Sequence, residues 1–221
     1  MARESKAARR ERALKVAEQM SIRYPDAECA LRHSDPFTLT IAVLLSAQTT
    51  DAAVNKVTPE LFRRWGTPEA MAGASPADVE EVIRTIGFYR VKAKNCIAAA
   101  QMICARHGGS VPQTMEELTA LPGVGRKTAN IVLNNAFGIV EGIAVDTHVF
   151  RIAHMLRFTS ADTPEKVERD LLALYPPHMW GPINHQWVLF GRELCVARRP
   201  RCGQCALSSE SLCPSARTVP E

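Results

Sequence analysis

The sequence predicts an all-α fold, on three observations. Apolar residues recur at spacings of three and four along most of the chain. No stretch shows the strict alternation of apolar and polar residues that indicates a half-buried strand. Proline repeatedly follows a residue that can cap a helix start, as at Asp35-Pro36, Thr67-Pro68, Ser75-Pro76 and Thr163-Pro164.

The N-terminal half divides into helices at such signals. Helices are expected over 37–47 and 51–64, from 68, from 76, and over 91–106. Asp35 is expected to cap the first of them. Gly87 should stop the helix that starts at 76, and Gly108-Gly109 should end the long one, because glycine readily adopts the left-handed conformation that closes a helix.

The C-terminal half shows the same punctuation. Thr114 and Glu117 have the spacing of a capping box, which predicts a short helix after them. A helix over 126–137 should close at Gly138. Asp146 then stands where an N-cap belongs, ahead of another apolar helix face.

Length and composition allow one large domain or two smaller ones. The chain has 221 residues, of which 46% are hydrophobic. Its longest apolar run, 39–45, is far shorter than the roughly 20 residues that cross a bilayer, so we expect no membrane partner. The chain begins with charged residues in place of an apolar signal core, which predicts a cytoplasmic location, at the nucleoid if the chain is bacterial.

The net charge of +4 is too small to identify a nucleic-acid binder, but basic residues gather near both ends. They are Arg3, Lys6, Arg9, Arg10, Arg12 and Lys15, and then Arg192, Arg198, Arg199 and Arg201. Such clusters either face phosphate or simply solvate a helix, and the sequence leaves both open.

Residues 121–129, Leu-Pro-Gly-Val-Gly-Arg-Lys-Thr-Ala, join two predicted helices through a glycine turn. The glycines allow backbone angles closed to other residues and leave room for phosphate. Backbone amides at Gly123 and Gly125, the positive end of the next helix and Arg126 would form an anion site that binds DNA without reading bases. The alternative is an ordinary corner between two helices.

This stretch resembles the helix-hairpin-helix of the endonuclease III glycosylases. Residues 142–149, Gly-Ile-Ala-Val-Asp-Thr-His-Val, are similar to a second motif of that family. Segments 41–48 and 85–89 extend the resemblance, which covers about 14–213. It implies two helical lobes that flank a DNA groove. One is a six-helix lobe over 29–139 that contains the hairpin, and the other combines 1–28 with 140–221 and contains the C-terminal cysteines.

The resemblance implies that Lys127 is the nucleophile and Asp146 its carboxylate partner. A lysine attacks only as a neutral amine, so a nucleophilic lysine needs a lowered pKa. The positive end of a helix and the neighbouring Arg126 are expected to lower it, and so is desolvation. The alternative for Lys127 is phosphate contact alone. Asp146 could be an N-cap and nothing more, although both roles can coexist. Lysine at this position separates the chain from the related adenine glycosylases, and we expect the chain to lack their additional C-terminal domain.

Extruding a nucleotide costs a few kcal/mol of lost base stacking. A protein side chain that fills the gap in the duplex can partly offset this cost. The resemblance places Gln48 and Phe88 at inserting positions, although family members often have leucine where Phe88 stands. The alternatives are a helix-end amide and a core aromatic. His148 is expected either to touch phosphate or to be satisfied within the fold.

Four of the seven cysteines form a local set near the C-terminus, spaced C-x6-C-x2-C-x7-C: Cys195, Cys202, Cys205 and Cys213. Without an export signal, a metal site is favoured over disulfides. Spacing alone allows zinc or a 4Fe–4S cluster, and the resemblance implies the cluster. The last gap has seven residues where the family usually has five, so we expect the additional residues to bulge outward.

Together these features predict a monomeric glycosylase and abasic-site lyase that acts on oxidised pyrimidines in damaged duplex DNA, for example thymine glycol. The reaction implied is displacement of the base by Lys127, an imine with the opened sugar, and β-elimination. Two alternatives remain from the sequence: a monofunctional glycosylase that uses water, and a non-catalytic helix-hairpin-helix module that only binds DNA.

Overall fold

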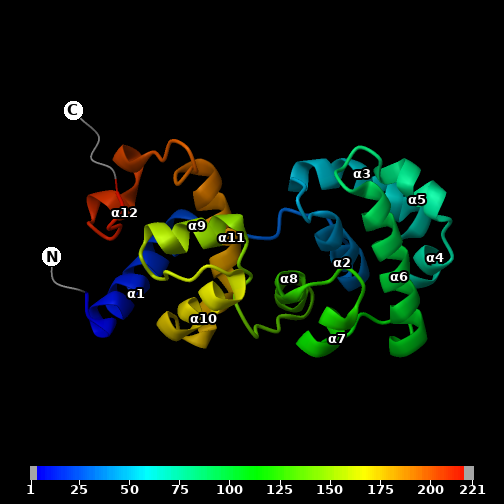
Figure 1. The fold of residues 1–221 in the computed structure, drawn as a ribbon, viewed down its shortest axis with the longest axis horizontal. Helices are drawn as coiled ribbons and strands as arrows, with labels where there is room; N and C mark the ends of the chain where they lie inside the picture. Colours follow the sequence, from blue (N-terminus) through cyan, green and yellow to red (C-terminus); the bar gives the residue numbers. More distant parts are fainter. Residues whose placement is uncertain (1–3, 217–221) are drawn as a thin grey trace. The chain divides into compact units, whose positions relative to one another are not determined.

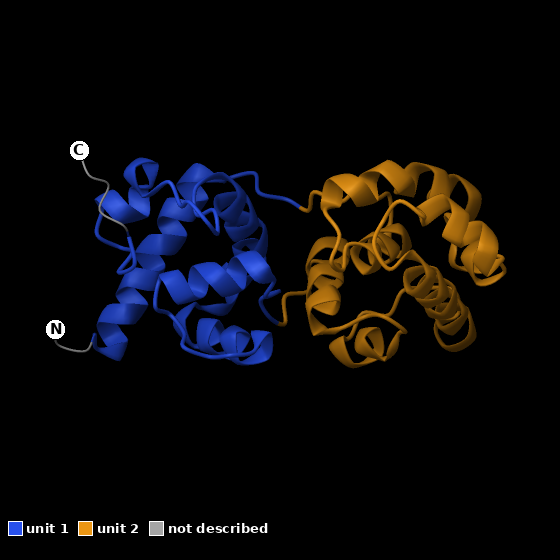
Figure 2. Cartoon of the chain, turned by 45° about the horizontal axis from the view of Figure 1, so that its top comes forward, with its two compact units in different colours: residues 1–28, 142–221 blue, residues 29–141 orange. Residues whose placement is uncertain are grey.

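The computed structural model describes residues 4–216, and within that range the regular structure is helical, with no strand. The predicted all-α class is therefore confirmed (Figure 1). Contacts divide the chain into two compact units, Met1–Glu28 with Gly142–Glu221 (unit 1) and Cys29–Glu141 (unit 2) (Figure 2). Arg3 of the N-terminal basic cluster lies outside the described residues.

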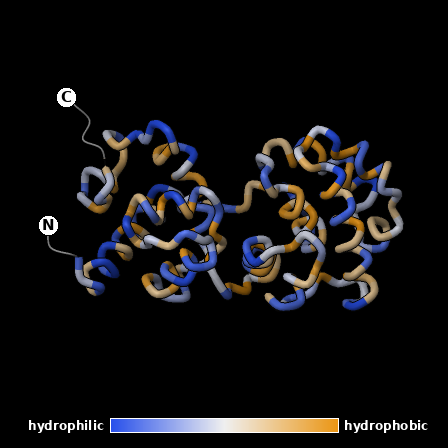
Figure 3. Tube along the Cα trace, viewed as in Figure 1, coloured by the Kyte–Doolittle hydropathy of each residue, from blue (hydrophilic) through white to orange (hydrophobic). Residues whose placement is uncertain are grey.

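Unit 2 is built around one apolar helix. Within 29–141 it has seven helices where six were expected: α2 (Pro36–Leu45), α3 (Asp51–Trp65), α4 (Pro68–Ala72), α5 (Pro76–Ile83), α6 (Tyr89–His107), α7 (Met115–Ala120) and α8 (Arg126–Phe137). Every residue from Phe37 to Leu45 is buried, and the hydropathy colouring shows α2 as a hydrophobic segment (Figure 3). Helix α2 packs against α8, α3 and α6, while α6 also covers α4 and α5. The hairpin before α8 is thus held by the core of this unit.

Unit 1 combines the start of the chain with its C-terminal part. Its elements are α1 (Lys6–Arg23), α9 (Thr147–Met155), α10 (Pro164–Leu174), η1 (Pro177–Met179), α11 (Trp180–Glu193), η2 (Cys202–Gln204) and α12 (Ala206–Ser209). Trp187, 1% exposed, lies at the centre of its core, with the rings of Phe158 and Tyr175 at centroid distances of 6.5 and 6.4 Å. Helix α1 packs against α10, α11 and α12, which explains why the first residues belong to this unit.

Most predicted helix starts are confirmed by their caps. Asp35 accepts from the amide of Thr38 at 2.9 Å, and the Thr38 hydroxyl accepts from the Asp35 amide in return. Thr67 and Thr163 likewise cap α4 and α10. Thr114 caps α7, but its hydroxyl donates to the Glu117 carboxylate, so only half of the predicted capping box forms.

The predicted stop at Gly87 is wrong. Helix α5 ends at Ile83, with Arg84 as its C-cap, and the next residues form turns. Gly108 and Gly138, in contrast, adopt the left-handed conformation at the ends of α6 and α8, as predicted. None of the helices within 4–216 combines the length and apolarity that crossing a membrane requires.

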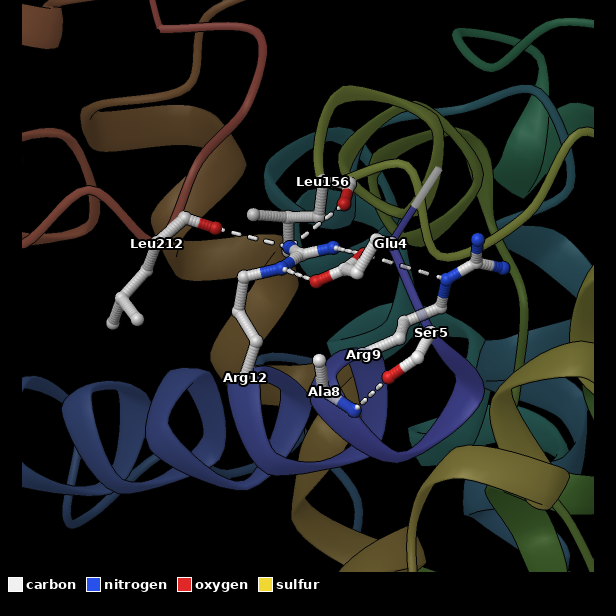
Figure 4. A network of polar contacts seen from close by, with 7 residues as sticks. All are labelled: Glu4, Ser5, Ala8, Arg9, Arg12, Leu156 and Leu212. Atoms are coloured by element: carbon white, nitrogen blue, oxygen red, sulfur yellow. Dashed lines mark hydrogen bonds and ion pairs between the residues drawn. The ribbon is translucent and has the colours of Figure 1, made fainter. Parts of the chain in front are cut away.

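Arg12, from the N-terminal basic cluster, is a structural residue. Its Nη1 donates to the carbonyls of Leu156 (2.9 Å) and Leu212 (3.0 Å), and its Nε and Nη2 donate to the Glu4 carboxylate (Figure 4). The guanidinium also lies 4.7 Å from the centroid of the Phe158 ring. The hydrogen bond from Arg12 lowers the pKa of Glu4. Arg12 is therefore not part of a phosphate-facing surface.

Arg12→Ala should lower the free energy of unfolding by about 2–3 kcal/mol, because it leaves two carbonyls without their charged donor. Arg10→Ala is the matched control, since Arg10 is exposed on the same helix and its loss should stay within about 0.5 kcal/mol. Denaturant titration measures both, and equal effects would show that the Arg12 network contributes little.

Candidate active site and cysteine cluster

The hairpin is a tight turn that requires one of its glycines. The Val124 amide donates to the Leu121 carbonyl at 3.0 Å, which closes a turn with proline and then glycine at its centre. Gly123 has φ +79°, the value a type II turn requires at that position. A Cβ on Gly123 would lie 2.7 Å from Nδ2 of Asn95, so the turn also packs directly onto α6. Leu121 and Val124 are buried and anchor it.

Gly125 has a different role from the one expected. Its φ of −93° is open to any residue, so the backbone does not need glycine there. Nothing lies within 4 Å of a Cβ built on it, and Gly123, Gly125 and Arg126 are exposed. As the N-cap of α8, Gly125 supplies no side-chain hydrogen bond to the first-turn amides. The start of α8 therefore has no side-chain cap and lies open at the surface, as the anion site predicted from the sequence would require.

Alanine substitutions should separate the two glycines. Gly123→Ala should destabilise the protein by about 1–3 kcal/mol, because a left-handed conformation and contact with Asn95 both oppose the methyl group. Gly125→Ala should leave stability nearly unchanged and still weaken binding to undamaged duplex DNA, because its methyl group occupies the phosphate approach. Thermal melts and binding titrations at fixed salt measure the pair. Normal DNA affinity of Gly125→Ala would contradict the assignment.

Lys127 lies in the first turn of α8 and is exposed. Its side chain is therefore not buried within unit 2, where desolvation by burial was one of the two causes expected from the sequence. It follows the N-cap Gly125 by two residues and Arg126 by one.

Asp146 caps α9 with one of its two carboxylate oxygens. Oδ1 accepts from the amides of His148 (2.9 Å) and Val149 (2.8 Å). Oδ2 accepts no hydrogen bond from the residues that the structure describes. The predicted N-cap is confirmed, and it uses only Oδ1 of the carboxylate.

His148 is engaged within unit 1. Its Nδ1 lies 3.3 Å from Nη2 of Arg151, and it packs so closely on Gly191 that a Cβ there would approach it to 2.5 Å. Arg151 also donates to the carbonyl of Cys195 at 2.8 Å. Arg151 was missed by the sequence reasoning, since nothing in its neighbourhood in the chain distinguishes it from other surface arginines.

Gln48 and Phe88 are both exposed, Phe88 to 65%. The alternative of a core aromatic is thereby excluded for Phe88. Both residues adopt left-handed backbone conformations, with φ of 52° and 57°. Each therefore projects from a constrained turn at the surface of unit 2.

The four C-terminal cysteines line one pocket of unit 1. Burial raises the pKa of the Cys195 thiol to about 11, and burial also raises the pKa of Cys205 and Cys213. Backbone amides of Leu207 and Ser208 point at the Cys205 sulfur and oppose that rise. Within 4–216, no three cysteine, histidine or acidic side chains are already in metal-binding geometry. Four thiols in one pocket, with amides aimed at a sulfur, are nevertheless a donor set that suits a tetrathiolate centre.

The long last gap is partly folded inward. Leu207 and Leu212 are buried, and both the Leu212 and the Cys213 amides donate to the Leu207 carbonyl at 2.9 Å. Of the four residues between them, Ser208 is half-buried and 209–211 are exposed. The expected outward bulge is thus limited to a polar tip, while two leucines anchor its base.

Comparison with known proteins identifies the class to which this fold and hairpin belong. Residues 41–177 match the model of the HhH-GPD superfamily of base excision DNA repair proteins, which covers more than half of the chain, and the chain belongs to that superfamily. It is a member of the endonuclease III family within it. It is 46% identical to endonuclease III of Synechocystis sp. over 96% of this chain and 95% of that protein, and 44% identical to that of Escherichia coli K12 over 90% and 93%.

Solved structures agree with this membership. A trapped endonuclease III–DNA covalent intermediate with an estranged adenine superposes with a TM-score of 0.88 at 42% identity, over 94% of this chain and 96% of that one. A non-covalent endonuclease III–DNA complex gives the same values. A thermostable thymine-DNA glycosylase, 23% identical with a TM-score of 0.80, shares the fold.

Proposed function

We propose that this protein is a bifunctional DNA glycosylase and abasic-site lyase that removes oxidised pyrimidines from duplex DNA in base excision repair. It acts as a monomer in the cytoplasm, at the nucleoid if the chain is bacterial. The observation that carries the proposal is the amine of Lys127 beside an uncapped helix start and an open glycine hairpin. The proposed reaction needs a nucleophile near a site for backbone phosphate, and this arrangement supports it.

In the proposed reaction Lys127 is the nucleophile. The Lys127 amine attacks C1′ of the extruded nucleotide, the glycosidic bond breaks, and the damaged base leaves with the bonding electrons and takes up a proton. Ring opening gives an imine between Lys127 and the sugar. Loss of a proton from C2′ then expels the 3′ phosphate by β-elimination and nicks the strand. Asp146 Oδ2 stabilises the positive charge that develops on the sugar, or accepts the amine proton.

A lesion panel with borohydride trapping tests the proposal. Duplexes with thymine glycol or another oxidised pyrimidine should lose the base and be nicked, and borohydride should fix a covalent protein–DNA complex by reducing the imine. Base release without trapping would indicate a monofunctional enzyme that uses water. Duplex binding without release from any lesion would indicate a module that only binds DNA.

We further propose that Cys195, Cys202, Cys205 and Cys213 hold a 4Fe–4S cluster. When bound, the cluster supplies a rigid cross-link instead of redox chemistry, since neither base removal nor β-elimination transfers electrons. It would brace the segment that presents Arg198, Arg199 and Arg201, which are exposed, to phosphate.

Elemental analysis of protein prepared without oxygen tests the cofactor. Iron and acid-labile sulfide should be present in equal amounts and should be lost together in Cys202→Ser. Cys104→Ser, a cysteine of unit 2, is the matched control and should retain both. Zinc without sulfide would overturn the cluster and leave a zinc site.

A further inference from the structure

The two candidate inserting residues share a backbone conformation that costs energy. Among the described residues other than glycine, those with positive φ are Gln48, Phe88, Arg157 and Ser211. A left-handed conformation costs an ordinary residue about 1–2 kcal/mol, so it persists only where the surroundings hold it. Gln48 and Phe88 lie on different turns of unit 2, and both side chains are exposed. Something beneath the surface must keep both turns in place.

Lys92 makes a hydrogen bond to each of these turns. Its backbone amide donates to the carbonyl of Phe88 at 3.0 Å, in the first turn of α6. Its Nζ donates to Oγ1 of Thr49, the residue after Gln48, at 2.6 Å. One residue therefore connects the turn that presents Phe88 with the turn that presents Gln48.

Thr49 passes this connection around Gln48. Its hydroxyl donates to the carbonyl of Ala47 at 3.4 Å, and its amide donates to the carbonyl of Ser46 at 3.0 Å. These bonds join the residues on either side of Gln48. The buried amine of Lys92 holds this turn through its hydrogen bond to Thr49.

Stability does not explain a lysine at position 92. The residue is 5% exposed, and burial lowers its pKa. No carboxylate among residues 4–216 forms an ion pair with it. Burying an amine without a carboxylate partner is costly, and an apolar residue of similar volume is often at least as stable. The amine donates to Thr49 in either protonation state, so the connection does not depend on its charge.

We propose that Lys92 is a positioning residue which, through Thr49, holds Gln48 and Phe88 in the geometry that inserts into the duplex when a nucleotide is extruded. The inference rests on the proposed function, because it concerns the step before base removal. Opening a base pair costs a few kcal/mol. Turns that are already held in the inserting geometry lose less conformational entropy on binding, so more of the binding free energy is available to open the pair.

The test compares Thr49→Val, which removes the acceptor at nearly constant shape, with Thr49→Ser, which keeps the hydroxyl. Single-turnover base removal is measured on two duplexes with the same thymine glycol, one opposite adenine and one opposite an abasic analogue. Thr49→Val should be slowed about tenfold on the paired lesion, the effect of one lost hydrogen bond, and far less on the unpaired lesion. Thr49→Ser should match the wild type on both.

Lys92→Met gives a second, independent variant. It should show the same selective slowing, with a melting temperature equal to or above that of the wild type, since the buried amine is gone. Affinity for undamaged duplex should be unchanged in all variants, because the hairpin anion site is intact.

The outcomes are distinguishable. Equal slowing on both duplexes, or slowing in Thr49→Ser as large as in Thr49→Val, would reveal a merely structural role and overturn the proposal. Wild-type rates in Thr49→Val and Lys92→Met would also overturn it. If the wild type itself releases no base from either duplex, the proposed function fails, and the inference that rests on it fails too.

Discussion

Lys127→Gln should abolish borohydride trapping and strand cleavage and slow base removal by about three orders of magnitude or more. The amide keeps the length and polarity of the side chain but cannot form an imine, so the covalent path closes. Single-turnover assays on a thymine glycol duplex, with gel analysis of trapped complexes, measure all three effects. The melting temperature should hardly change, because Lys127 is exposed.

Lys56→Gln is the matched control for Lys127→Gln. Lys56 is an exposed lysine of α3 in the same unit, so its substitution makes the same charge change on a different helix. It should keep trapping and cleavage and alter only the salt-dependent affinity, slightly. Strand cleavage through an imine by Lys127→Gln at the wild-type rate would remove Lys127 from the mechanism.

Asp146→Asn should separate capping from chemistry at this residue. Asparagine caps helices about as well as aspartate, so the two bonds to the α9 amides should survive and stability should change by no more than about 0.5 kcal/mol. The lost negative charge should nevertheless lower the rate of base removal by about 10²–10⁴-fold, the usual range for a general base or an electrostatic stabiliser. Melting curves and single-turnover rates on the same preparation give both numbers.

Asp146→Ala completes the comparison. It removes cap and charge together, so it should add a stability loss of about 1 kcal/mol to the same kinetic defect. If Asp146→Asn retains the wild-type rate, the carboxylate is a helix cap and nothing more, and Oδ2 has no role in the reaction.

Local signals in the sequence predicted the helix starts well. Asp35, Thr67, Thr163 and Asp146 all cap the helices expected of them, because a cap depends on neighbours within three residues. The stop predicted at Gly87 is wrong, because a glycine only permits a helix to end and does not make the helix extend as far as the glycine. Helix α5 ends earlier, at Ile83.

What the sequence could not reveal depends on contacts distant along the chain. Arg12 belongs to a basic run, yet its guanidinium binds carbonyls 144 and 200 residues away. Lys92 has the sequence surroundings of a surface lysine and is buried because α6 packs into unit 2. The exposure of Lys127 and the single-oxygen cap by Asp146 likewise required coordinates.

The most direct test of the account is to locate the covalent bond. Wild-type protein is trapped with borohydride on a thymine glycol duplex, digested with protease and nuclease, and mapped by mass spectrometry. The account predicts that the reduced sugar remnant is attached to the peptide that contains Lys127, at its Nζ. A remnant attached to any other amine, Lys92 or the N-terminus included, would contradict it.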